Sequence, residues 1–362
     1  MTRAADSHWM ARALQLAERG LHTTSPNPRV GCVLVQGDAV VGDGWHERAG
    51  EPHAEVHALR AAGSKARGAT AYVTLEPCSH HGRTPPCADA LIAAGVSRVV
   101  CAMQDPNPQV AGSGLARLVA AGIEVESGLM EAAARELNTG FVSRMTRGVP
   151  WVRSKIAASL DGRTALANGI SQWITGEAAR QDVQRWRARS CAVLTGSGTL
   201  LADDPQLNVR IDTERQPLRV VLDSALRTPP AARILQGGKV LLFTASQDAH
   251  KRAALEARGA EVLRLADAQG RVDLHAVLRE LARRGINEVL VEAGRTLNGA
   301  LLRAGLVDEL VLYLAPQLLG DAARGMADLG GLVRLEQKVE LDWRDVRRIG
   351  NDLRITAGVR HV

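Results

Sequence analysis

Short apolar runs alternate with stretches of helical period in the first part of the chain. The expected strands lie at 29–35, 39–45, 71–75 and 97–103, and the expected helices run over 6–19 and from about residues 53 and 87. Gly37 and Asp38 separate the first two runs, and this pair is typical of a hairpin turn. Strands that alternate with helices predict an α/β layer in which helices cover a sheet.

The second part of the chain repeats this alternation. The expected strands lie at 151–158, 191–195, 219–223, 240–244, 288–292 and 308–314, and the expected helices at 176–189, 248–258, 273–284 and 296–304. Between the two parts, TRGVP at 146–150 combines glycine, proline and charge. We place a domain boundary there, which divides the chain into two α/β domains, 1–147 and 148–362.

Length and composition exclude several kinds of protein. A chain of 362 residues is long enough for two cores, and no apolar run approaches the roughly 20 residues that a membrane span requires. The N-terminal segment lacks the apolar stretch of a secretory signal, so we expect a cytoplasmic protein. The net charge of +6 permits an anionic ligand, but the basic residues are scattered, and nucleic acid is not an expected partner.

Five cysteines are too few for a disulfide framework in a chain of this length. Cys32, Cys101 and Cys191 lie in apolar runs and are expected in the cores. The other two, Cys78 and Cys87, belong to the segment EPCSHHGRTPPC, which follows an expected strand. Upstream, PHAEVHAL at 52–59 places a histidine and a glutamate in the first turn of an expected helix.

One imidazole and two thiolates are the ligand set of a catalytic zinc ion that keeps a fourth position for water. His53, Cys78 and Cys87 are therefore candidate ligands. Zinc lowers the pKa of bound water to about 7, and Glu55 is placed to take that proton and pass it to a leaving nitrogen. Two alternatives stay open: His80 or His81 replaces a cysteine as ligand, or the site is closed and structural.

The HAE and PC…C motifs resemble the cytidine/deoxycytidylate deaminase family of zinc enzymes, although the cysteines are farther apart here than in the usual PCxxC. Over nearly the whole chain, longer motifs resemble the bifunctional deaminase/reductases of riboflavin biosynthesis. These motifs are EPCSHHGRTPPC, SPNPRVGCVLV (25–35), AMQDPNPQVAGSG (102–114), KIAASLDGRTA (155–165) and SQWITG (171–176).

The resemblance implies a fold, two reactions and two cofactors. The fold is an α/β/α zinc-deaminase sandwich, followed by an α/β domain that is similar to dihydrofolate reductase and has a mostly parallel central sheet. The first reaction is hydrolytic deamination of a small phosphorylated pyrimidine, and Asn27 is implied as a substrate contact. The second is NADPH-dependent reduction of its ribosyl side chain to ribityl. The family also implies a homo-oligomer, a dimer formed through the reductase domain.

The residues themselves show only a weak nicotinamide signal. GSGLAR at 112–117 and GSGTLL at 196–201 are partial dinucleotide fingerprints, so a Rossmann domain is not favoured. EVLVEAGRTLNGALL at 288–302 predicts a strand, a turn at Gly294 and a helix with Thr296 as N-cap. The free N–H groups at such a helix start can bind a phosphate.

The resemblance also assigns contacts in the second domain by position. The implied cofactor contacts are Ala157, Trp173, Thr199, Asp203, Ser224, Gly294, Arg295, Thr296, Leu297, Asn298, Gly299 and Ala300. The implied substrate contacts are Ser171, Arg187, Leu207, Arg210 and Glu292.

Some of these residues also suit their roles chemically. Arg187 and Arg210 suit the ribose 5-phosphate, because a guanidinium group binds phosphate through two parallel hydrogen bonds. Glu292 ends an apolar strand, where an unpaired carboxylate is costly, and Lys155 interrupts another strand. We therefore expect Lys155 and Glu292 to meet across the site, and Lys155 is the candidate catalytic residue of the reduction.

Two other functions stay open. One is a tRNA or nucleoside deaminase with an appended domain, although a chain with 2 Phe and 2 Tyr offers few aromatic platforms for a flipped base. The other is a zinc-stabilised ligand-binding protein without turnover.

Overall fold

The computed structural model of the chain describes residues 3–79, 86–108 and 110–360. The chain divides into two compact units, Met1–Val149 and Pro150–Val362. The division falls inside the segment 146–150 that combines glycine, proline and charge. Each unit has its own sheet.

The first unit is built on a mixed sheet. Its strands are β1 Gly31–Gln36, β2 Ala39–Trp45, β3 Thr70–Val73, β4 Arg98–Cys101 and β5 Glu124–Ser127. Its helices are α1 Arg3–Glu18, α2 Ala54–Ala62, α3 Cys87–Ala94, α4 Ser113–Ala120, α5 Glu131–Leu137 and α6 Thr139–Arg147. The strand order is β2-β1-β3-β4-β5, in which β1 is antiparallel to β2 and β3, and β3, β4 and β5 are parallel.

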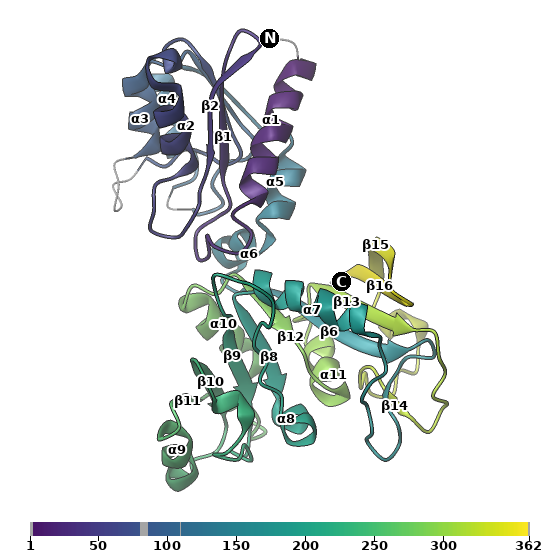
Figure 1. Cartoon of the computed structure of the whole chain (residues 1–362). Coiled ribbons are helices and arrows are strands. Elements are labelled where there is room, and N and C mark those ends of the chain that lie inside the picture. Colours follow the sequence, from purple (N-terminus) through teal and green to yellow (C-terminus); the bar gives the residue numbers. More distant parts are fainter. Residues whose placement is uncertain (1–2, 80–85, 109, 361–362) are drawn as a thin grey trace. The chain divides into compact units, whose positions relative to one another are not determined.

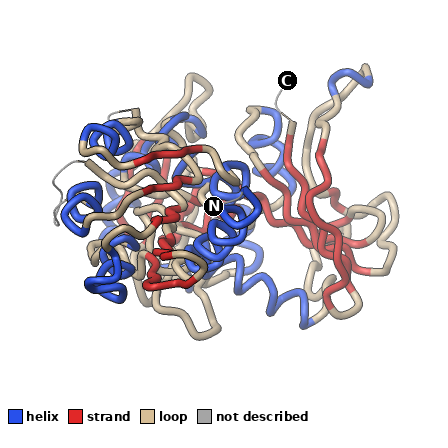
Figure 2. Tube along the Cα trace, turned by 90° about the horizontal axis from the view of Figure 1, so that it is seen from above, coloured by secondary structure: helices blue, strands red, loops and turns tan. Residues whose placement is uncertain are grey.

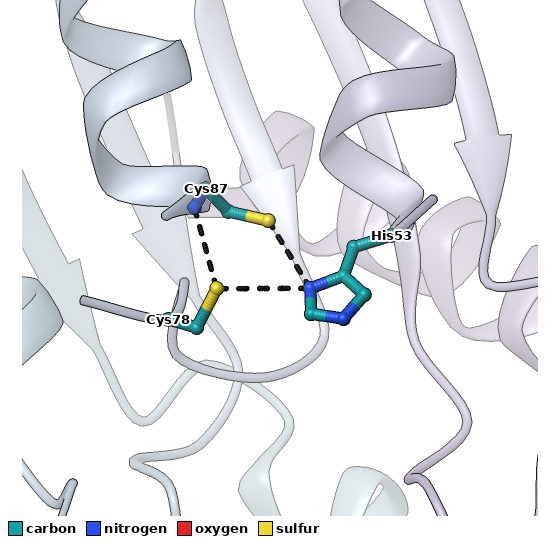
Figure 3. Close-up of side chains that lie close together, drawn as sticks. All are labelled: His53, Cys78 and Cys87. Carbon is teal, nitrogen blue, oxygen red and sulfur yellow. Dashed lines mark hydrogen bonds between the residues drawn. The ribbon is translucent and has the colours of Figure 1, made fainter. Parts of the chain in front are cut away.

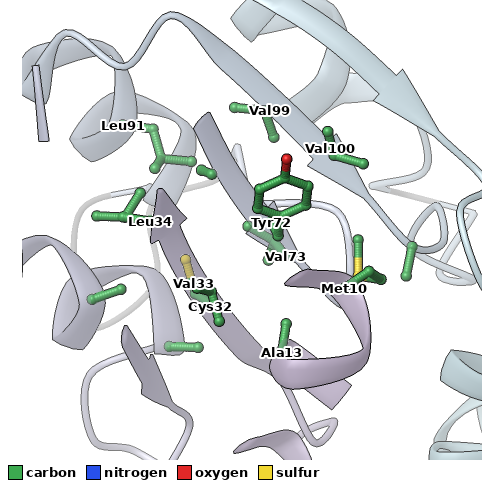
Figure 4. Packing of buried hydrophobic residues seen from close by; sticks show 14 of the residues in the cluster. Met10, Ala13, Cys32, Val33, Leu34, Tyr72, Val73, Leu91, Val99 and Val100 are labelled. Atoms are coloured by element: carbon green, nitrogen blue, oxygen red, sulfur yellow. The ribbon is translucent and has the colours of Figure 1, made fainter. Parts of the chain in front are cut away.

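Helices cover both faces of this sheet (Figure 1), with α1 and α5 on one face and α2, α3 and α4 on the other. Figure 4 shows the packing that joins the layers, with Met10 and Ala13 of α1 beside the strands and Leu91 of α3 beside Leu34. Helix α1 lies so close to β1 that a Cβ atom at Gly31 would come within 2.0 Å of the Ala13 carbonyl oxygen. The predicted α/β/α sandwich is confirmed.

The second unit has a larger and mostly parallel sheet. Its strands are β6 Trp151–Ser159, β7 Arg163–Ala165, β8 Ala192–Gly196, β9 Leu218–Leu222, β10 Val240–Thr244, β11 Ala260–Arg264, β12 Glu288–Val291, β13 Glu309–Ala315, β14 Arg324–Gly325, β15 Leu341–Ile349 and β16 Asp352–Val359. The order in the main sheet is β11-β10-β9-β8-β12-β6-β13-β16-β15. The strands from β11 to β13 are parallel, and β16 and β15 extend the sheet as antiparallel strands.

Helices connect the parallel strands of this sheet. They are α7 Glu177–Arg189, α8 Ser197–Asp203, α9 Ala249–Glu256, α10 Leu274–Arg283 and α11 Arg295–Arg303. The predicted mostly parallel sheet is confirmed. In the part of the chain that the structure describes, no helix combines the length and the apolar character that a membrane crossing needs.

Several strands have no counterpart among the sequence predictions, namely β5, β7, β11, β14, β15 and β16. Strand β15, LDWRDVRRI, exposes most of its side chains, so its sequence lacks the apolar alternation of a half-buried strand. Figure 2 shows the strands that lead to the C-terminus as paired red segments. Strand β15 forms because its backbone pairs with β16. Its own pattern of polar and apolar residues does not predict this pairing.

Candidate functional site

Small residues bring α2 against the sheet of the first unit and so place its first turn. A Cβ atom at Gly42 would lie 2.3 Å from the Ala58 carbonyl oxygen, and one at Gly44 would lie 2.9 Å from the Ala54 carbonyl oxygen. Strand β2 therefore needs glycine at both positions for α2 to pack directly on its backbone. His53 is the N-cap residue of this helix, and Glu55 lies in its first turn with 3% of its surface exposed.

The two cysteines approach His53 from a loop and from a second helix start. Cys78 lies in the loop after β3, and Cys87 is the first residue of α3, directly after the N-cap residue Pro86. The Cys87 backbone N–H donates to Cys78 Sγ at 3.3 Å, and the Ala88 N–H donates to the Cys78 carbonyl oxygen at 3.1 Å. The N-terminus of α3 thus holds both sulfur atoms, and its dipole favours thiolate there.

Figure 3 shows the three side chains converging. His53 Nδ1 lies 3.3 Å from Cys87 Sγ and 3.7 Å from Cys78 Sγ, and the three ligand atoms all lie within 4.8 Å of one another. This is the donor set of a catalytic zinc site. Glu55 Oε2 is buried and has no hydrogen-bond partner in the described residues, which leaves a carboxylate oxygen for a water molecule. The residues present therefore fit a zinc ion with an open position.

The electrostatics of this cluster favour a cation. A hydrogen bond from Cys87 and the nearby His53 lower the pKa of Cys78 to about 4, although burial opposes this. The hydrogen bond with Cys78, together with burial, raises the pKa of Cys87 far above its usual value. Two adjacent sulfurs resist carrying two negative charges, and a divalent cation removes that repulsion. Burial raises the pKa of Glu55 to about 7, which suits a group that accepts and returns a proton.

The proposed alternative ligands His80 and His81 lie outside the described residues. The three ligand atoms of His53, Cys78 and Cys87 converge without either of them.

The predicted substrate residue Asn27 lies beside a histidine that the sequence analysis missed. Asn27 Nδ2 is 3.1 Å from His46 Nε2, and His46 Nδ1 is 3.1 Å from the Pro52 carbonyl oxygen. That carbonyl can only accept, so Nδ1 carries the hydrogen and Nε2 accepts from Asn27. The His46 and His53 rings are 5.3 Å apart, and burial lowers the pKa of His46. Its position directly after a strand was the only available signal.

Glu76 is a second residue that the sequence analysis missed. It is 3% exposed, and its carboxylate accepts backbone hydrogen bonds from the segment that leads into α4. The donors are the N–H groups of Asp105 at 3.0 Å, Gly112 at 2.9 Å, Gly114 at 2.8 Å and Leu115 at 3.4 Å. A Cβ atom at Gly114 would lie 1.9 Å from the Pro77 carbonyl oxygen. Glu76 therefore fastens this segment against the residues that carry the Cys78 ligand.

In the second unit, the predicted cofactor residues gather at the carboxyl ends of neighbouring parallel strands, where α/β folds bind ligands. Ala157 lies on β6, Thr199 and Asp203 lie on α8 after β8, and Ser224 follows β9. The turn at Gly294 follows β12, and a Cβ atom there would lie 3.5 Å from Thr199 Oγ1. Strand order thus brings together residues that are far apart in the sequence.

The turn after β12 differs from its prediction in one detail. Helix α11 begins at Arg295 with Gly294 as N-cap, so Thr296 is the second helical residue and not the cap. Asn298 is 1% exposed and bonds inside the fold: its Nδ2 donates to the carbonyl oxygens of Ala293 at 3.1 Å and Met326 at 3.2 Å. Its side chain therefore holds the turn in place.

Lys155 and Glu292 interact electrostatically, as predicted, but the side chain bonded directly to Glu292 is Arg187. Glu292 forms a two-point ion pair with Arg187, with Nε–Oε1 at 2.5 Å and Nη2–Oε2 at 2.9 Å. Burial opposes ionisation of Glu292, but Arg187 and then Lys155 outweigh it and lower the pKa of that carboxyl. Burial lowers the pKa of Lys155, and Glu292 partly offsets this. The ammonium group of Lys155 has no hydrogen-bond partner within 3–79, 86–108 and 110–360.

The other predicted contacts differ in exposure. Trp173 is 68% exposed, and the Arg180 guanidinium lies 4.7 Å from its ring centre. Leu207 is buried with a positive φ of 54°, and the backbone N–H of Arg210 donates to Gln184 Oε1 at 3.0 Å. Ser171 is partly buried. Trp173 is thus free to stack on a ligand, whereas Leu207 shapes the backbone.

A His-Cys-Cys cluster at two helix starts, with a buried glutamate beside it, defines the first unit as a zinc-dependent deaminase domain. Residues 3–103 match the cytidine and deoxycytidylate deaminase zinc-binding region. Residues 150–355 match the RibD C-terminal domain, so the second half is a reductase domain.

The chain belongs to the RibD family of riboflavin biosynthesis proteins, which are bifunctional deaminase/reductases. It is 54% identical over 361 residues to riboflavin biosynthesis protein RibD of Escherichia coli, covering 96% of this chain and 98% of that protein. A structure of Acinetobacter baumannii RibD has a TM-score of 0.93 and 48% identity, and the match covers 99% of this chain and 100% of that one. The predicted family, its two activities and its zinc and NADPH cofactors are confirmed.

A third relative carries both activities in its name. The diaminohydroxyphosphoribosylaminopyrimidine deaminase/5-amino-6-(5-phosphoribosylamino)uracil reductase of Thermotoga maritima has a TM-score of 0.88 and 33% identity, with 99% of each chain covered.

Proposed function

We propose that the first unit hydrolyses the 2-amino group of 2,5-diamino-6-(5-phosphoribosylamino)pyrimidin-4(3H)-one and that the second unit reduces the ribosyl group of the product to ribityl. The observation that carries this proposal is the convergence of His53, Cys78 and Cys87 beside the buried carboxylate of Glu55. The deamination consumes water and releases ammonia. The reduction consumes NADPH and a proton, so the two steps have separate readouts.

In the deaminase site, His53, Cys78 and Cys87 hold the zinc ion. Zinc supplies Lewis-acid chemistry that makes water acidic enough to attack at neutral pH. Glu55 accepts a proton at its unpartnered oxygen and returns it to the leaving nitrogen, and its raised pKa of about 7 suits both transfers. Asn27 binds the pyrimidine: its amide nitrogen is bonded to His46, which orients the amide oxygen toward a substrate N–H donor.

In the reductase site, the bound NADPH supplies a hydride for C1′ of the ring-opened substrate. Lys155 donates the proton that the adjacent nitrogen needs, because its lowered pKa eases proton release. The Arg187 fork is engaged with Glu292, and its Nη1 donates to the Asn208 carbonyl oxygen at 3.0 Å, so Arg187 positions Glu292. Arg210 is then the arginine that binds the 5-phosphate. The Glu292 carboxylate accepts a hydrogen bond from a hydroxyl group of the sugar chain.

The remaining assigned residues form the rest of the two ligand sites. Ser171 and Leu207 line the substrate side, and Trp173 stacks on the cofactor. The other proposed cofactor contacts are Ala157, Thr199, Asp203, Ser224 and the turn 294–300. Their position at the carboxyl edge of the parallel sheet supports this assignment.

The test follows two reactions separately on the full chain: ammonia release from the diaminopyrimidine substrate, and NADPH oxidation with the deaminated product supplied directly. Glu55→Gln should lower ammonia release by at least a hundredfold, the low end for a general acid–base group, while zinc stays bound. Lys155→Ala should suppress NADPH oxidation and leave ammonia release near the wild-type rate. A chelator should stop the first reaction and spare most of the second. Loss of both activities in either variant would contradict two independent sites.

We also propose that the chain forms a homodimer through the second unit. Strand β15 lies at the edge of the main sheet with Trp343 66% and Val346 58% exposed, and Leu353 of the neighbouring β16 is 39% exposed. An exposed edge strand with apolar side chains is a template for pairing with another chain. A second copy of the same strand covers both the unpaired backbone groups and the apolar side chains.

A cytoplasmic location stays a prediction. All five cysteines are free thiols. The reducing cytoplasm keeps the proposed ligands Cys78 and Cys87 able to bind zinc.

A further inference from the structure

Lys155 carries its charge at a position where no protein group bonds to it. It lies on β6, between β12 and β13 in the sheet of the second unit. Its side chain is partly buried, and its ammonium group has no hydrogen-bond partner among the residues that the structure describes. The protein therefore stabilises this charge through neighbours that form no hydrogen bond with it.

The charged groups near Lys155 are engaged with other partners. Glu292, after β12, favours the ammonium form, and Arg187 of α7 opposes it. The Glu292 carboxylate is bonded at both oxygens by Arg187, and Arg210 acts on the same carboxylate. Arg153, earlier on β6, is paired with two buried glutamates. None of these charges is committed to Lys155.

Tyr313 of β13 presents an aromatic ring to the Lys155 ammonium group. Tyr313 pairs with Ala157 of β6, and Val311 pairs with Lys155, so Tyr313 is a diagonal neighbour of Lys155 on the same face of the sheet. The Lys155 Nζ atom lies over the ring, 5.9 Å from its centre. Tyr313 is fully buried, and a ring attracts a cation more strongly where water is excluded.

Helix α7 fixes this ring in place. Asp182 of α7 is 6% exposed, and its Oδ2 accepts from the Tyr313 hydroxyl group at 2.6 Å and from Arg354 Nη1 at 2.8 Å. Burial and the bond to Asp182 raise the pKa of Tyr313, so its hydroxyl group keeps its hydrogen. Ala179 and Val183 of the same helix pack with Tyr313 in one apolar cluster. These contacts hold the ring in its orientation toward β6.

We propose that Tyr313 is a positioning residue for the reduction: its ring holds the ammonium group of Lys155, and Asp182 holds the ring. The proposal rests on the proposed role of Lys155 as proton donor. Attraction to the ring favours the charged form, so the ring keeps the proton on Lys155 up to a higher pH. Without the ring, the ammonium form that donates the proton is lost at a lower pH.

The test measures the pH dependence of kcat/KM for the deaminated product, followed by NADPH oxidation on the full chain. This constant should fall as the pH rises through the pKa of Lys155. In Tyr313→Leu the fall should move to lower pH by about 0.5 to 1.5 units, which corresponds to the usual strength of a cation–π contact. Tyr313→Phe keeps the ring, so the fall should stay at the wild-type pH, although this variant should melt at a lower temperature.

Phe243→Leu is the matched control for the loss of a buried ring. Phe243 is fully buried on β10, and three strands separate β10 from β6 in the sheet. This variant should melt at a lower temperature and keep the wild-type pH dependence.

Ring fluorination tests the same contact with little change of shape. Fluorine withdraws electron density from the face of the ring and so weakens its attraction for a cation. The chain has 2 tyrosines, and the other one, Tyr72, lies in the first unit. Replacing both with fluorotyrosine should move the fall to lower pH, and further with each added fluorine. The same labelling of Tyr313→Phe should leave the pH dependence unchanged.

The outcomes separate this inference from the proposed function. If Tyr313→Leu or the fluorinated protein keeps the wild-type pH dependence, Tyr313 only stabilises the fold and the inference is overturned; where Tyr313→Leu does not fold, the fluorinated protein decides. An equal shift in Tyr313→Phe would assign the effect to the hydroxyl group, and the inference would again be wrong. If Lys155→Ala oxidises NADPH at the wild-type rate, the proposed role of Lys155 fails, and this inference fails with it.

Discussion

The buried carboxylate of Glu76 is expected to control zinc binding without touching the metal ligands. Replacing Glu76 with Gln keeps the volume but turns one oxygen into an NH₂ group, which then faces backbone N–H donors. Three of the bonds to this carboxylate are 3.0 Å or shorter. Hydrogen bonds to charged groups contribute about 1.5–3 kcal/mol each and are not additive, so we expect a loss of about 3 kcal/mol in the stability of the first unit.

The zinc affinity should fall as well, because the segment released from Glu76 packs on Pro77, next to Cys78. A Cβ atom at Gly114 would lie 1.9 Å from the Pro77 carbonyl oxygen. Loss of residues that orient metal ligands typically weakens binding about 10- to 100-fold. Gly114→Ala should have the same effect from the opposite side, since the new methyl group pushes the Pro77–Cys78 peptide.

The assay is a competition titration of zinc with a chromogenic chelator, combined with thermal melting. Asp6→Asn is the matched control, since Asp6 is also a buried carboxylate of the first unit but bonds Tyr72 and Arg98 instead. It should lower the melting temperature and leave the zinc affinity unchanged. If Glu76→Gln and Gly114→Ala bind zinc as tightly as wild type, the carboxylate only stabilises the fold and the reasoning is refuted.

Two further predictions concern stability and assembly. Hydrogen bonds from Arg98 and then Tyr72 outweigh burial and hold the pKa of Asp6 below its ordinary value. These bonds therefore stabilise the fold fully above the unfolded pKa of about 3.9. This stabilisation is lost as the pH falls through the folded pKa. When the pH is lowered below about 4, the melting temperature of Asp6→Asn should therefore fall less than that of wild type. Trp343→Asp should convert a dimer into a monomer in sedimentation analysis, and an unchanged oligomer would place the interface elsewhere.

Local pattern was sufficient for most of the secondary structure and for the metal chemistry. The strands β6, β8, β9, β10, β12 and β13 lie where the apolar runs predicted them. A buried parallel strand is apolar along its length, so its own sequence marks it. Histidine, two cysteines and a glutamate likewise identify the zinc chemistry, because few other side chains bind zinc.

Only the tertiary structure decided which groups meet. Glu292 pairs with Arg187 although they are 105 positions apart, and His46 meets Asn27 from a different strand end. The Glu76 carboxylate accepts hydrogen bonds from backbone N–H groups. Every residue except proline has such a group, so no residue pattern reveals these contacts.

The same division explains why β15 was missed while most of the helices were found; the short helices α4 and α8 were not predicted. A helix closes its hydrogen bonds within four residues, so composition and period along the chain determine it. The pairing of a sheet edge or the partners of a buried carboxylate depend on contacts between distant segments, and those contacts exist only after the chain has folded.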